Sequence, residues 1–66
     1  MTEKEYLDAL NKALKWLPKP EKEICFNYAR EMIEDRIENG LTETEAVAQL
    51  ETPQQMAKAF LEDRGS

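Results

Sequence analysis

Apolar residues recur every three or four positions along most of this chain, which is the spacing of one face of an α-helix. They fall into four segments that are separated by threonine, glycine and proline. Because the connections between the segments are only a few residues long, consecutive helices must be neighbours in space. The sequence therefore predicts an all-α fold, a compact bundle of four helices at about residues 3–16, 20–39, 43–50 and 53–63.

Threonine, glycine and proline mark the ends of these predicted helices. Thr2, Thr42 and Thr52 each stand three residues before a glutamate or glutamine, the spacing of a capping box, in which each side chain covers the other residue's free backbone N–H. Gly40 can adopt the left-handed conformation that ends a helix. Pro18 cannot continue a helical hydrogen-bond ladder, and it biases the preceding residue away from helix.

The second predicted helix carries apolar residues around more than half of its circumference. At about 100° per residue they occupy a sector of roughly 220°, which is too wide for contact with one neighbour. We therefore expect this longest helix to be central, with the first helix on one flank and the last two on the other. The residues of the sector are Ile24, Cys25, Phe26, Tyr28, Ala29, Met32, Ile33 and Ile37.

Length, charge and hydropathy limit the kinds of protein that this chain can be. The 66 residues are enough for one domain, covering residues 1–66. The net charge of −5 opposes binding to a polyanion and no basic stripe is present, so direct nucleic-acid binding is not expected. No apolar run approaches the roughly 20 residues that cross a bilayer, so any attachment to a membrane must use a segment outside this chain.

Two residues of the second helix are interpreted as structural. Cys25 is the only cysteine and cannot form an internal disulfide, which favours a reducing, cytoplasmic location. We expect it to be a small buried hydrophobic residue. Arg36 is expected to bury its aliphatic stem and to pair its head with a carboxylate such as Glu51 or Glu62.

The residues of common catalytic sites are missing. The chain has no histidine, and its one serine is Ser66, so neither a nucleophile with a histidine base nor a zinc site with histidine ligands can be assembled. The carboxylates of Glu31, Glu34, Asp35 and Glu38 are interpreted as a solvated helix face. The sequence predicts no enzyme, no catalytic residues, no cofactor and no metal ligands.

Three apolar side chains are candidates for a partner-binding surface. Trp16 lies roughly 100° from the centre of the first helix's apolar stripe, so it either covers the following turn or anchors a partner. Phe26 and Ile37 lie at one border of the sector on the second helix. They either belong to the core or form a partner or dimer surface together with Trp16.

Several motifs occur in order along nearly the whole chain. They are YLDALNKALK at residues 6–15 with Leu-Pro at 17–18, Asn-Tyr at 27–28, ENGLTETEA at 38–46 and LETPQQMA at 50–57. In this order they resemble the HAAS domain family, whose name denotes a helix-turn-helix-associated alpha-helical signalling domain. The chain departs from the family at Glu51, where the family usually has glycine.

The resemblance implies a domain at the N-terminus of a bacterial membrane protein, at the cytoplasmic face of the inner membrane and often encoded beside a PadR-like transcription regulator. It implies no catalysis. We therefore expect a cytoplasmic signalling or protein-interaction domain that binds a protein partner, such as that regulator, and couples it to a membrane segment. Gly65 and Ser66 are the only linker-like residues, and they mark either a cloning remnant or a junction with a following segment.

Two alternatives stay open at this point. The first is a structural homodimerisation module, in which Phe26, Ile33 and Ile37 meet across a two-fold axis. The second is a small-ligand or metal sensor, with a pocket between the second and fourth helices near Tyr28 and Arg36.

Overall fold

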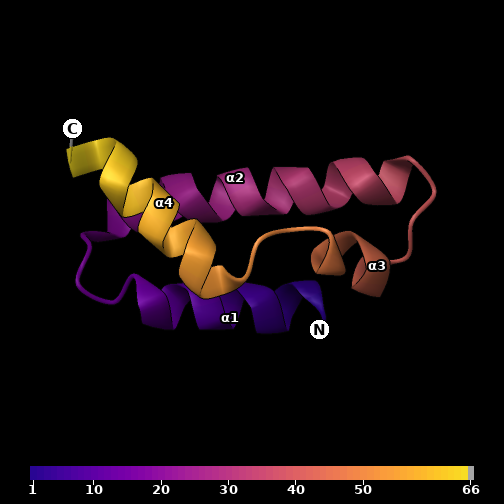
Figure 1. Cartoon of the computed structure of the whole chain (residues 1–66), viewed down its shortest axis with the longest axis horizontal. Helices are drawn as coiled ribbons and strands as arrows, with labels where there is room; N and C mark the ends of the chain where they lie inside the picture. Colours follow the sequence, from indigo (N-terminus) through magenta and orange to yellow (C-terminus); the bar gives the residue numbers. More distant parts are fainter. Residues whose placement is uncertain (66) are drawn as a thin grey trace.

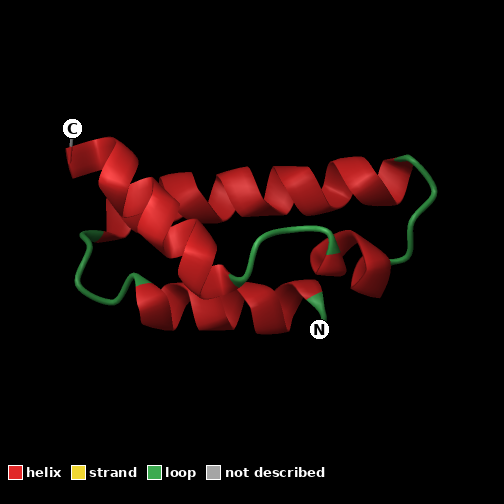
Figure 2. Cartoon of the chain, in the orientation of Figure 1, coloured by secondary structure: helices red, strands yellow, loops and turns green. Residues whose placement is uncertain are grey.

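A computed structural model describes the backbone of residues 1–65 and the side chains of residues 1–63. The described residues form four α-helices and no strand (Figures 1 and 2). The predicted all-α bundle is therefore confirmed, whereas Ser66, one of the two linker-like residues, lies outside the described residues. The helices are α1 (Glu3–Ala13), α2 (Lys19–Glu38), α3 (Glu43–Ala48) and α4 (Pro53–Gly65).

The first helix ends three residues earlier than the sequence predicts. Leu14 is the C-cap of α1, with φ −108° and ψ 19°, and the chain continues as turns, in which the Leu17 N–H donates to the Leu14 carbonyl at 2.9 Å. Pro18 restricts the residue before it and so favours this exit from helix. As a result Trp16 lies in the connection between α1 and α2, not on a helix.

The three predicted capping boxes are present. In the box that starts α3, the Glu45 N–H donates to Thr42 Oγ1 at 3.2 Å and the Thr42 N–H donates to Glu45 Oε1 at 2.9 Å. The same reciprocal pair starts α1, and a third joins Thr52 to Gln55 at the start of α4. The hydrogen bond from the Thr42 backbone, followed by the one with its side chain, lowers the pKa of Glu45. These local contacts fix where α1, α3 and α4 begin, whereas α2 begins after Pro18 without a side-chain cap.

Replacing Thr42 with alanine is expected to destabilise the domain by about 1 kcal/mol, because the first turn of α3 loses its side-chain acceptor. Thr44→Ala is the matched control, since Thr44 is exposed within the same helix and caps nothing. Urea unfolding followed by circular dichroism measures both variants. Equal midpoints for the two variants would contradict the role of the cap.

Gly40 ends α2 as the sequence predicts. Its φ is +103°, and its N–H donates to the Ile37 carbonyl at 3.0 Å while the Leu41 N–H donates to the Arg36 carbonyl at 3.1 Å. This pair of bonds is a Schellman motif, which turns the chain sharply toward α3. Glu51 does not have positive φ, so the turn before α4 forms without the glycine usual in the family.

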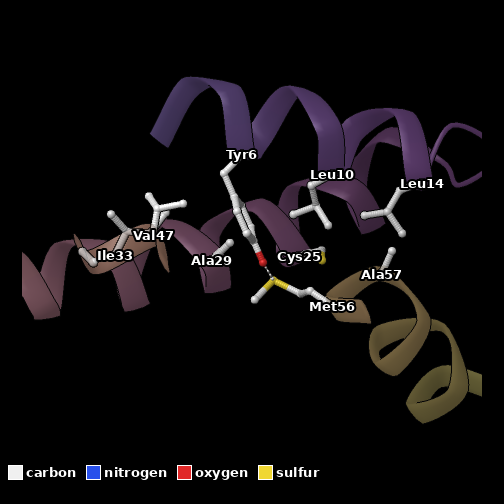
Figure 3. Close-up of a cluster of buried hydrophobic side chains, with 10 residues drawn as sticks. Tyr6, Leu10, Leu14, Cys25, Ala29, Ile33, Val47, Met56 and Ala57 are labelled. Atoms are coloured by element: carbon white, nitrogen blue, oxygen red, sulfur yellow. Dashed lines mark hydrogen bonds between the residues drawn. The ribbon is translucent and has the colours of Figure 1, made fainter. Parts of the chain in front are cut away.

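The helices enclose one small apolar core (Figure 3). Tyr6 and Leu10 of α1 and its C-cap Leu14 are fully buried, and they point into the space between the other helices. Opposite them, α2 contributes a narrow stripe of smaller buried residues. The buried residues of this core are Tyr6, Leu10, Leu14, Cys25, Ala29, Ile33, Ala46, Val47, Met56 and Ala57.

The packing differs from the expected arrangement in one respect. α1 packs against all three other helices, whereas α2 packs mainly on α1 and α3, and α4 packs mainly on α1. In Figure 1, α1 and α2 run alongside each other and α4 crosses obliquely. Within the apolar sector of α2, Ile24 and Tyr28 are 60% and 56% exposed. The sector is therefore covered on one flank, and its other flank borders a groove.

Candidate partner-binding surfaces

Trp16 is the most exposed large apolar side chain among the described residues, with 87% of its surface accessible. The Lys15 ammonium lies 5.2 Å from the centroid of the indole ring, within the range of a cation–π contact. Of the two predicted roles, covering the following turn would bury the ring, which is not observed. Trp16 thus has the exposure that contact with a partner requires.

Phe26 and Ile37 are placed differently from each other and from Trp16. Phe26 is partly buried and packs against the core, whereas Ile37 is 39% exposed near the end of α2. Eleven residues separate the two along α2, which corresponds to about 16 Å. Trp16 precedes the other end of this helix. The structure therefore does not gather the three candidates into one compact patch, and their partner-binding role stays a prediction.

The predicted dimer surface needs a correction. Ile33 was expected to meet its counterpart across a two-fold axis, but its side chain is completely buried between α2 and the rest of the core. A side chain with no accessible surface cannot contact a second chain unless the core opens. The sequence could not show this, because Ile33 and Ile37 lie on similar sides of one helix.

A groove lies between α2 and α4, where the sequence suggested a pocket. Its volume is about 640 Å³, and Tyr28 lines it as expected, but Arg36 does not. The connection between α3 and α4 closes one side of the groove. The lining residues are Ile24, Cys25, Tyr28, Met32, Gln49, Leu50, Glu51, Met56, Ala59, Phe60 and Asp63.

Arg36 lies at one end of this groove with partners other than those predicted. Its Nε donates to Gln49 Oε1 at 3.2 Å, and its Nη1 donates to the Met32 carbonyl at 3.1 Å. The predicted pairing with Glu51 or Glu62 is therefore wrong. Arg36 as a whole residue is partly buried. Through Gln49, Arg36 ties the end of α3 to α2.

Two weak acids lie in the core beside the groove. Cys25 has no accessible surface, which confirms the prediction of a buried thiol, and burial raises its pKa. The Tyr6 hydroxyl donates to the Glu51 carbonyl at 2.7 Å and contacts Met56 Sδ at 3.5 Å. Burial, followed by the nearby charges of Cys25 and Glu51, raises the pKa of Tyr6 to about 12. Both groups are therefore protonated at neutral pH and act as core residues.

The described residues contain no cluster of three or more histidine, cysteine, aspartate or glutamate side chains placed to hold a metal ion. None of the helices in the described part of the chain combines the length and the apolar character needed to cross a bilayer.

Sequence reasoning missed most of the groove. Ile24 and Met32 were assigned to the covered sector of α2, and Ala59 was not singled out. The sequence did contain one signal, because the apolar sector of α2 is much wider than the stripe of α2 that is buried in the core. When an apolar sector of a helix is too wide for the neighbouring helices to cover, part of it is exposed to solvent.

Comparison with known proteins places the chain in a family. Searches of curated proteins and of solved structures gave no match. The family model HAAS matches residues 5–59, which include the four helical segments except the last turns of α4 and the first residues of α1. Since this match covers most of the 66 residues, the chain belongs to the HAAS family.

Proposed function

We propose that this chain is a non-catalytic signalling and protein-interaction domain at the cytoplasmic face of the bacterial inner membrane. It forms the N-terminal part of a longer membrane protein and couples the membrane segment of that protein to a PadR-like transcription regulator. Membership of the HAAS family carries this proposal, because the resemblance implies such neighbours.

The exposure of Trp16 adds physical support. A tryptophan with 87% of its surface exposed contributes little to the stability of the fold, but its burial by a partner would contribute strongly to binding. Its neighbour Lys15 holds a positive charge over the ring. Removing Trp16 should therefore change binding far more than folding.

Trp16→Ala is expected to weaken binding of a PadR-like regulator by about thirtyfold, the effect of losing a hot-spot residue. Isothermal titration calorimetry with the purified regulator measures this change. The free energy of unfolding should stay within about 0.5 kcal/mol of the wild type, because the side chain lies outside the core.

Leu61→Ala is the matched control for this experiment, since Leu61 is also exposed, at 43%, but lies on α4. Its binding should equal that of the wild type. A regulator that does not bind the wild-type domain would reject the proposed partner. Undiminished binding by Trp16→Ala would reject the role of Trp16 alone.

A further inference from the structure

The groove between α2 and α4 has apolar walls, and the charged residues that line it are acidic. Ile24, Tyr28 and Met32 form the wall on α2, and Met56, Ala59 and Phe60 form the wall on α4. The two charged side chains among the lining residues are Glu51 and Asp63. The chain places apolar surface next to negative charge at this site.

The solvent side of the α2 wall is acidic as well. Glu31 follows Tyr28 by three positions and Asp35 follows Met32 by three, so both carboxylates lie next to groove residues on the helix surface. Both side chains are exposed. Arg36, a basic residue at one end of the groove, already donates to Gln49 and to the Met32 carbonyl. Among the side chains that the structure describes, the exposed charges along this rim of α2 are therefore negative, in keeping with the net charge of −5.

The dimensions of the groove suit a short helix. Met32 lies eight positions after Ile24, so the α2 wall is about 12 Å long, and the α4 wall from Met56 to Asp63 is about 10 Å long. That length accommodates about two helical turns, enough for apolar side chains at positions i, i+3, i+4 and i+7 of a partner helix. The thioethers of Met32 and Met56 can adapt to different apolar partners.

We propose that this groove binds a basic amphipathic helix of a partner protein, with the apolar face of that helix against Tyr28 and Phe60 and its lysines or arginines near Glu31, Asp35 and Glu51. The inference rests on the proposed function, because it names the kind of partner segment that the domain takes. Charge complementarity selects this occupant. A second copy of this chain would bring another net charge of −5 to an acidic rim.

The test uses two synthetic 14-residue peptides with the same leucines at i, i+3, i+4 and i+7, one with lysine and one with glutamate at the other positions. The lysine peptide is expected to bind the chain, with amide shifts in the NMR spectrum gathered on α2 and α4 around the groove. The glutamate peptide should bind at least about tenfold more weakly, because it meets charge of its own sign. Equal binding of the two peptides would overturn the charge argument.

Ile24→Glu and Leu61→Glu then separate groove binding from adsorption to an acidic surface. Both residues are exposed aliphatic side chains on helices, at 60% and 43%, and both variants gain the same negative charge. Only Ile24 lines the groove, whereas Leu61 stands two positions after Ala59 and thus about 160° around α4 from it. Circular dichroism confirms that each variant is folded.

Ile24→Glu is expected to weaken binding of the lysine peptide by about tenfold despite the added attractive charge, because an apolar contact is lost. Leu61→Glu should bind as tightly as the wild type or more tightly. If both variants bind the peptide equally tightly, the groove is not its site and the inference falls. Binding of the regulator with no effect of Ile24→Glu would also overturn the groove while leaving the proposed function intact. If the domain binds the lysine peptide in the groove but does not bind the regulator, the groove is supported as a binding site and the regulator is rejected as the partner.

Discussion

Tyr6→Ala is expected to lower the free energy of unfolding by about 3–5 kcal/mol, the usual cost of removing a buried aromatic ring. The ring is 1% exposed and lies where α1, α4 and the connection before α4 meet. For a domain of this size the total stability is about 3–10 kcal/mol, so the variant should be largely unfolded or close to its midpoint at 37 °C. Urea unfolding followed by circular dichroism at several temperatures measures the loss.

Two control variants divide this effect into its parts. Tyr6→Phe keeps the ring and removes the hydroxyl that donates to the Glu51 carbonyl, which should cost about 0.5–1.5 kcal/mol. Tyr28→Ala removes the same side chain from a position that is 56% exposed, and it should change stability by about 0.5 kcal/mol or less. A Tyr6→Ala variant as stable as Tyr28→Ala would show that Tyr6 does not hold α4 to α1.

The importance of Tyr6 also shows where sequence reasoning stops. The helix starts at Thr42 and Thr52 and the stop at Gly40 were predictable, because each depends on contacts within a few residues. The position of α4 depends on a contact between Tyr6 and Glu51, which are 45 residues apart. No local sequence pattern predicts that the Tyr6 hydroxyl will bond to the connection before α4.

The apolar sector of α2 illustrates the same limit. Cys25 and Ala29 are buried, whereas Ile24 and Tyr28, one position earlier in each case, are mostly exposed. Hydrophobicity alone would choose the larger isoleucine and tyrosine for the core. The structure buries the smaller pair because small side chains allow a neighbouring helix to approach closely. The larger side chains of Leu10 and Leu14 fill the core on the opposite side. Because Ile24 and Tyr28 stay outside the core, they line the groove between α2 and α4.

The placement of Trp16 shows the same limit of local patterns. Its angular position off the α1 stripe indicated a side chain outside the core, and it is exposed. The sequence did not place it beyond the end of α1, because the apolar spacing continues through Leu14 and Leu17 into the turn. Apolar periodicity alone therefore overestimates helix length where a turn also contributes to the core.

The domain is expected to lose stability in alkaline solution through Tyr6 and Cys25. The pKa of Tyr6 is raised from 10.0 to about 12 in the folded chain, chiefly by burial, and burial also raises the pKa of Cys25. In both cases the unfolded state loses its proton at lower pH than the folded state does, so deprotonation favours unfolding. The contribution of Tyr6 is fully present below about pH 10 and is lost as the pH rises toward 12.

The size of this effect follows from the shift in the Tyr6 pKa. Two pKa units correspond to about 2–3 kcal/mol, a large fraction of the stability of so small a domain. Cys25 adds to the loss and begins to do so at lower pH, because the ordinary pKa of a thiol lies below that of a phenol. Urea unfolding of the wild type between pH 8 and 11.5 should therefore show a steep fall in the midpoint.

Tyr6→Phe tests the assignment, because phenylalanine cannot ionise. This variant should start from a lower midpoint at pH 8 and then fall less steeply than the wild type above pH 10. Tyr28→Phe should follow the wild-type curve, since Tyr28 is mostly exposed and lies outside the core. Cys25→Ala should flatten the earlier part of the fall. If the midpoints of the wild type and Tyr6→Phe fall in parallel up to pH 11.5, Tyr6 ionisation does not drive alkaline unfolding and its phenol is not shielded from water as the structure indicates.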